Sequence, residues 1–181
     1  MMDNSFFAYI QELELIAFFS GYPLVYAFIL FIGGDLPLKN DFKSRLVHLL
    51  PFGYALAGTL YLGLQLRNLY PDYSFENIHQ SVQNPYLTIW GLLSIFFWIP
   101  APGKRPAFSL MHSLVIFYLL LKNIFIQLTA VSTDMDVVRN DMKIYTISLL
   151  LNLGSFALIV LLSILYTRFI KRAASPENTL F

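Results

Sequence analysis

Five long apolar stretches, separated by shorter polar segments, dominate the pattern of hydrophobic and polar positions along the chain. A helix needs about 20 mostly apolar residues to cross the hydrocarbon core of a bilayer. We therefore predict an all-α integral membrane helical bundle with five transmembrane helices. The spans are expected at residues 15–34, 46–66, 85–100, 107–130 and 144–170.

The first span contains residues that interrupt a helix. Gly21 and Pro23 both lie inside it, and a proline removes one backbone hydrogen bond from a helix interior. We expect a kink at residues 21–23. The segments between the spans are read as loops, because proline, glycine and charged residues gather there. Residues 1–172 are expected to form a single transmembrane domain, followed by a flexible tail at residues 173–181.

The third span is the shortest, and the positive charges test whether it crosses the membrane. With five spans, eight of the 12 Lys and Arg residues fall on one side and three on the other, and Lys122 lies inside a span. Without the third crossing, the division becomes six against five. Cytoplasmic loops carry an excess of Lys and Arg. The charges favour five spans, with the N-terminus outside and the C-terminus in the cytoplasm.

The composition agrees with a membrane protein. The chain is 57% hydrophobic and 13% charged, whereas an average soluble domain is about 45–50% apolar and about 25% charged. A net charge of +1 gives no basic surface for nucleic acid, so we expect no nucleic-acid partner. The absence of cysteine excludes disulfides and thiolate metal sites.

Several polar residues fall inside or beside the apolar stretches and are predicted to form an intramembrane cluster. Lys122 lies in the outer part of the fourth span, where it can extend to the interface or form an ion pair with Glu14 at the outer end of the first span. His112, Asn123 and Gln127 lie close together on one side of the fourth span, which should face the bundle. Asn152 of the fifth span is a candidate hydrogen-bond partner for that stripe.

Two histidines occur at similar depth on different spans. His48 is near the start of the second span and His112 is near the start of the fourth, and both spans run outward from the cytoplasmic side. Two helices that offer histidines at matched depth can bind one haem b through its two axial positions. Haem b is therefore an alternative cofactor, and the principal expectation is that the chain carries no cofactor and no metal.

Small residues mark the expected helix-packing seams. Gly53, Ala57, Gly58 and Gly63 lie on the second span and Gly154 on the fifth. Small side chains allow two helix backbones to approach closely in a membrane. The seams predict close helix contacts, either within one chain or between copies.

The sequence lacks the local motifs of common enzymes, including HExxH, GxSxG and a phosphate-binding glycine loop. The main hypothesis is a non-enzymatic membrane subunit or scaffold of the plasma (inner) membrane that acts through helix contacts in the bilayer. Its partners would be the lipid bilayer and either further copies or other membrane subunits. Two alternatives are an oligomeric pore or channel that perturbs a membrane, lined by the polar stripe, and a haem-binding redox anchor.

Overall fold

The computed structural model describes residues 4–35, 40–129 and 135–173, and every regular element in these ranges is helical. In chain order the elements are α1 (Asn4–Phe19), α2 (Tyr22–Asp35), α3 (Asn40–Leu69), α4 (Phe75–Ser81), α5 (Pro85–Leu93), the 3₁₀ helix η1 (Ser94–Trp98), α6 (Pro100–Gly103), α7 (Pro106–Thr129) and α8 (Met135–Ala173). The predicted all-α class is confirmed for this part of the chain.

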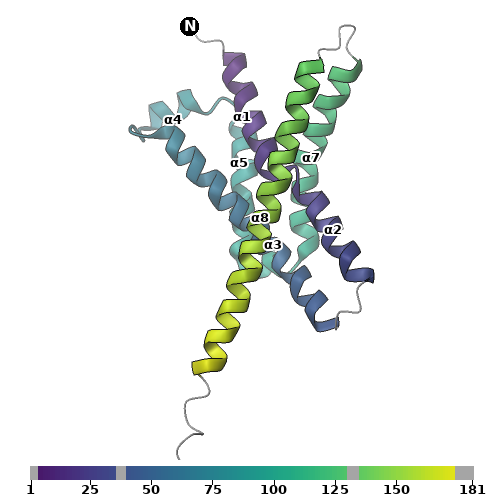
Figure 1. The fold of residues 1–181 in the computed structure, drawn as a ribbon. Coiled ribbons are helices and arrows are strands. Elements are labelled where there is room, and N and C mark those ends of the chain that lie inside the picture. The colour runs from purple at the N-terminus through teal and green to yellow at the C-terminus, as the bar shows by residue number, and fades with distance from the viewer. Residues whose placement is uncertain (1–3, 36–39, 130–134, 174–181) are drawn as a thin grey trace, which may run out of the picture.

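Four helical segments in the described ranges are long and apolar enough to cross a membrane, and they match four of the predicted spans. They are Ala8–Phe31, Ser44–Leu69, Pro106–Thr129 and Met142–Ile170. The remaining predicted span, residues 85–100, corresponds to the shorter apolar helix Pro85–Trp98, which joins α5 to η1. In Figure 1, α3 and α7 run in one direction along the bundle, whereas α2, α5 and α8 run in the other.

The first span is broken at Ser20 and Gly21, which separate α1 from α2, so the predicted kink is confirmed. At the break the chain passes directly against the backbone of α8. A Cβ atom on Gly21 would lie 2.5 Å from the backbone nitrogen of Leu149, so no larger residue fits without a shift. The glycine therefore sets how closely the first span approaches α8.

Two side chains of α8 bond the backbone groups that the break exposes. The Gly21 amide donates to Ser148 Oγ over 2.8 Å. Asn152 Nδ2 donates to the carbonyl oxygen of Phe18 over 2.8 Å, and it also donates to the Ser148 carbonyl oxygen within its own helix. Hydrocarbon offers no water to replace these bonds, so an interrupted helix inside a membrane needs such partners.

The core lies where α1, α2, α3 and α7 pack against one another, with η1 packed mainly against α3 and with α8 packed along α1 and α3. It is rich in aromatic side chains that are almost fully buried, including Phe19, Tyr22, Tyr54 and Tyr61. Their rings contact one another at centroid distances of 4.4–5.4 Å, for example Tyr22 with Tyr54 and Phe19 with Tyr61. Contacts of this kind add to the packing energy of the rings.

The predicted seam residues divide into two groups. Gly53, Ala57 and Gly58 are buried within the chain. Gly53 packs against Phe156 of α8, and Gly58 lies so close to Ser94 of η1 that a methyl group would clash with the hydroxyl.

The other two seam residues, Gly63 on α3 and Gly154 on α8, face outward. A Cβ atom on either glycine would meet nothing within 4 Å in the described chain. At these two positions the glycines therefore do not serve a close helix contact within the described chain.

Two segments that the sequence presented as loops contain helix. Residues 67–84 include α4, and α8 begins at Met135, inside the predicted loop 131–143. The N-terminus of α4 has a local cause, because Ser74 Oγ accepts a hydrogen bond from the Asn77 amide at 3.3 Å. Ser74 is itself held by Asp72, which accepts from the Ser74 amide at 2.9 Å.

Candidate functional site

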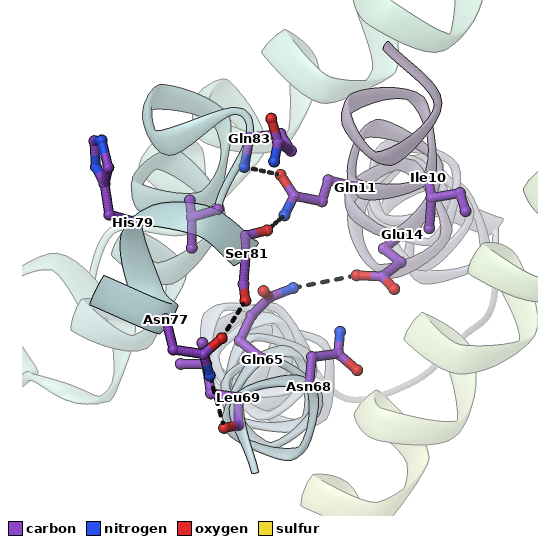
Figure 2. A pocket seen from close by; sticks show the side chains of 11 residues that line it. Ile10, Gln11, Glu14, Gln65, Asn68, Leu69, Asn77, His79, Ser81 and Gln83 are labelled. Atoms are coloured by element: carbon purple, nitrogen blue, oxygen red, sulfur yellow. Dashed lines mark hydrogen bonds between the residues drawn. The ribbon is translucent and has the colours of Figure 1, made fainter. Parts of the chain in front are cut away.

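A polar pocket of about 840 Å³ opens at the end of the bundle where α1 begins and α3 ends. We refer to it as the polar pocket. Figure 2 shows its side chains converging from α1, α3 and α4 and from the segment after α4. The polar side chains that line it include Gln11, Glu14, Gln65, Asn68, Asn77 and Ser81.

Gln11 of α1 attaches the segment between α4 and α5 to the bundle. Its amide nitrogen donates to the Ser81 carbonyl oxygen at 2.5 Å. Its amide oxygen accepts from the backbone amides of Gln83 and Asn84, each at 3.0 Å. The side chain of Asn84 returns a bond to the Ala8 carbonyl oxygen at 3.1 Å. One side chain thus satisfies three backbone groups and fixes one wall of the polar pocket (Figure 2).

Asn77 fixes another wall by joining α4 to the end of α3. Its side-chain nitrogen donates to the Leu69 carbonyl oxygen at 3.3 Å and to the Asp72 carbonyl oxygen at 2.5 Å. The hydroxyl of Ser81 donates to the side-chain oxygen of Asn77 at 3.1 Å. This wall of the polar pocket therefore depends on the amide side chain of Asn77, whose hydrogen bonds hold α4 and the turn before it against the end of α3.

Glu14 supplies the one carboxylate among the lining residues that the structure describes. It is partly buried on α1, and its Oε2 accepts a hydrogen bond from Gln65 Nε2 of α3 at 3.3 Å. Asn68 lies beside it in the lining (Figure 2). The described residues that line the pocket include no Lys or Arg.

Of the two alternatives offered for Lys122, an extension to the interface and an ion pair with Glu14, the structure does not show the ion pair. Lys122 is exposed on α7, and within the described residues it forms no ion pair. The neighbouring residue, Asn123, is the one that faces α1, where its Nδ2 donates to Glu12 Oε1 at 3.1 Å. The rotation of α7 therefore joins the two helices through Glu12 and Asn123.

A second cavity of about 640 Å³, here called the apolar groove, adjoins the polar pocket. Its walls are mainly aliphatic and aromatic side chains of α3, α4 and α5, among them Leu62, Leu66, Phe75 and Ile89. The two cavities share the lining residues Gln65, Leu69, His79, Val82 and Gln83. The end of α3 therefore carries a polar compartment and an apolar compartment side by side.

His112 lies in the core of the bundle, away from the polar pocket. Its Nε2 lies 2.9 Å from the Trp90 carbonyl oxygen, which can only accept, so Nε2 carries the hydrogen. Its Nδ1 then accepts from the Tyr54 hydroxyl at 2.7 Å. The ring also stacks on the Trp90 ring, at 4.7 Å and 4°. These contacts join α3, α5 and α7 to one another.

The two histidines considered for haem lie in different surroundings. Both ring nitrogens of His112 are engaged in hydrogen bonds, as just described, and His48 is exposed on α3. Ligation of iron by His112 would require breaking one of these bonds. The described residues contain no group of three or more His, Cys, Asp and Glu side chains suited to a metal ion.

The predicted polar cluster is distributed over separate contacts. His112 bonds within the aromatic core, Asn123 bonds to Glu12, and Asn152 bonds at the helix break. Gln127 is partly buried near the end of α7. The sequence placed these residues on the correct helices, but their partners are largely backbone carbonyls and aromatic hydroxyls, which hydrophobic periodicity does not reveal.

Sequence reasoning did not identify the polar pocket. Gln11 and Gln65 were not singled out, although Glu14 was placed at the outer end of the first span. The second span ends at the same side, so a comparison of depths would have brought Gln65 beside Glu14. Comparisons with protein-family models, with curated proteins and with solved structures find no match to this chain.

Proposed function

We propose that this protein is a non-enzymatic subunit or scaffold of the plasma (inner) membrane that acts through helix contacts in the bilayer. The observation that carries the proposal is the contrast between its interior and its surface. Polar side chains in the core, such as Ser148, Asn152 and His112, bond to groups of the same chain. The surface of α8 instead presents large apolar side chains around a glycine.

That outward face of α8 fits a partner helix. Leu150, Leu158 and Leu161 are 61%, 48% and 55% exposed, and they surround Gly154, against which nothing in the described chain packs. In a membrane, helices associate through close backbone approach at small residues and through interdigitation of their neighbours. Gly154 among leucines offers this arrangement to a helix of a second copy or of another membrane subunit.

We also propose that the chain crosses the membrane five times, with its N-terminus outside and its C-terminus in the cytoplasm. The segment Pro85–Trp98 combines nine α-helical and five 3₁₀ residues, which extend about 23 Å at the usual rises. It runs along the bundle between the ends where α3 finishes and α7 begins (Figure 1). Arg45 and Arg168 line one cavity between α3 and α8, as expected for a cytoplasmic end.

A photo-crosslinking experiment tests the scaffold proposal. A benzophenone side chain would replace Leu158 on α8, and in a control protein it would replace Tyr118, which is 64% exposed on α7. After illumination of membranes from the cells that naturally make the protein, we expect a protein adduct from position 158 and only lipid adducts from position 118. The mass of the adduct separates a second 20.8 kDa copy from another subunit.

A second variant shows whether Gly154 forms the contact. Adding Gly154→Leu to the Leu158 photoprobe should abolish the protein adduct, because the leucine prevents close approach of the partner backbone. Lipid adducts alone at position 158 in the unmodified background would contradict the proposal.

A further inference from the structure

The carboxylate of Glu14 lies in the polar pocket without a positively charged partner in the described chain. Its Oε2 is bonded to the neutral amide of Gln65, and neither lysine nor arginine is among the described residues that line the cavity. His79 is exposed, and Figure 2 shows it on the opposite side of the pocket with its ring directed away from Glu14. A partly buried carboxylate is stabilised when a cation pairs with it, so the pocket is electrostatically suited to a positively charged group.

The other side chains around Glu14 favour a cation that donates hydrogen bonds. Gln65 and Asn68 of α3 line the pocket together with Glu14. The side-chain oxygens of these two amides can accept hydrogen bonds from N–H groups, and the carboxylate can accept them at both of its oxygens. A protonated amine presents three N–H donors in a small volume. The lining is poorly suited to a phosphate or carboxylate, because Glu14 would repel either group.

The adjoining apolar groove is suited to a ligand whose remaining part is apolar. It continues from the polar pocket past Gln65, Leu69 and Val82, which line both cavities. Beyond them its walls include Leu62, Leu66 and Ile89. Each cavity falls within the range of about 300–1,000 Å³ that is usual for small-molecule sites.

From this juxtaposition we propose that the two cavities together form a binding site for an amphipathic amine. The ammonium group pairs with Glu14 and donates to the pocket amides, and an aliphatic or aryl tail occupies the apolar groove. The site goes beyond the scaffold role and does not depend on it, because the partner-helix face at Gly154 is on α8, and the described residues that line the two cavities include none from α8.

The test uses three probes that share a 12-carbon tail and differ in head group: dodecylamine, dodecanol and dodecanoate. The whole chain would be placed in nanodiscs of zwitterionic lipid, and its thermal unfolding would be followed with each probe. A ligand that binds only the folded state raises the midpoint as its concentration exceeds its dissociation constant. We expect dodecylamine to raise the midpoint, and dodecanol and dodecanoate to leave it unchanged.

Two variants provide a matched comparison. Glu14→Gln removes the pocket carboxylate, and we expect it to weaken dodecylamine binding at least about tenfold, which corresponds to the loss of one desolvated charge pair. Glu12→Gln removes the same charge two residues away, where the side chain bonds to Asn123 and does not line the pocket. It should bind dodecylamine as the unmodified protein does. Because both variants are measured in the same lipid, any effect of dodecylamine on the bilayer itself changes their midpoints equally, and a difference between them reports binding at Glu14.

A third variant keeps the test decisive if Glu14→Gln does not fold. Ile89 is 56% exposed and lines the apolar groove. Ile89→Trp should therefore fill the groove and weaken dodecylamine binding while leaving the midpoint of the unliganded protein near its original value. Equal stabilisation by dodecylamine and dodecanoate, equal binding by Glu14→Gln and the unmodified protein, or no stabilisation by dodecylamine would each overturn the proposal. The crosslink at position 158 is unaffected by any of these results.

Discussion

At the scale of single residues, a few side chains determine how closely the helices approach. Gly21 allows the broken first span to touch the α8 backbone, and Gly58 allows η1 to lie against α3. Ser148 and Asn152 then bond the backbone groups freed by the break. The importance of these residues lies in the distances and the backbone hydrogen bonds that they permit.

Gly21→Ala is expected to destabilise the protein. The added Cβ would lie 2.5 Å from the Leu149 nitrogen, and overpacking of this kind typically costs about 1–3 kcal/mol. The free energy of unfolding in detergent, measured with a chemical denaturant, checks the effect. The control is Gly63→Ala on α3, where a Cβ meets nothing within 4 Å and alanine favours the helix. Equal stability of the two variants would show that the helix break does not require the close contact.

Only part of this detail could be read from the residues in sequence. The interruption at Gly21 and Pro23 was evident, because glycine and proline act locally. The identity of its partners was not evident, because Ser148 and Asn152 are more than 120 positions away and bond to backbone atoms. Lys122 shows the limit of depth alone, since depth left open both an extension to the interface and an ion pair with Glu14, whereas the rotation of α7 places Asn123 toward α1.

At the scale of elements, long apolar helices are easy to predict and the short elements between them are not. The spans at residues 46–66 and 107–130 correspond closely to α3 and α7, because length and hydropathy alone define them. The seven residues of α4 carry no comparable signal. The capping residue Ser74 is the local feature that predicts it, and the wider position of α4 depends on Gln11, which lies far away in sequence.

We predict that Gln11→Leu loosens the connection between α4 and α5. The Gln83 and Asn84 amides would lose the acceptor that now lies 3.0 Å from each of them. One hydrogen bond typically contributes about 0.5–1.5 kcal/mol, so exchange of these amides with solvent deuterium should be roughly three- to tenfold faster. Hydrogen exchange resolved by mass spectrometry measures this, with α7 peptides as the internal control. Unchanged exchange at residues 83 and 84 would show that Gln11 does not hold the segment.

At the scale of the whole molecule, the distribution of the charges and the direction of the helices both favour five membrane crossings. The numbers of Lys and Arg residues in the loops favour five crossings, because with five crossings most of these residues lie on one side of the membrane. In the described structure α1 begins and α8 ends at opposite ends of the bundle (Figure 1). The short segment Pro85–Trp98 is the element on which the number of crossings depends.

Single cysteines provide a clean test of the five crossings, because the natural chain has none. Glu76 and Lys104 are both exposed and flank the Pro85–Trp98 segment. Glu76→Cys should react with a membrane-impermeant maleimide on intact cells, whereas Lys104→Cys should react only after the cells are permeabilised. If both cysteines react on intact cells, Pro85–Trp98 does not cross the membrane and the chain has four spans.

The interrupted first span has a consequence for how the protein is made. The groups that complete its hydrogen bonds belong to the last long helix, at Ser148 and Asn152. While the ribosome is still adding the middle of the chain, the exposed amide of Gly21 and carbonyl of Phe18 have no such partner to meet. A span made early is therefore among the last to reach its final form, and a nascent chain released before residue 148 carries a helix break whose backbone groups have not met these partners.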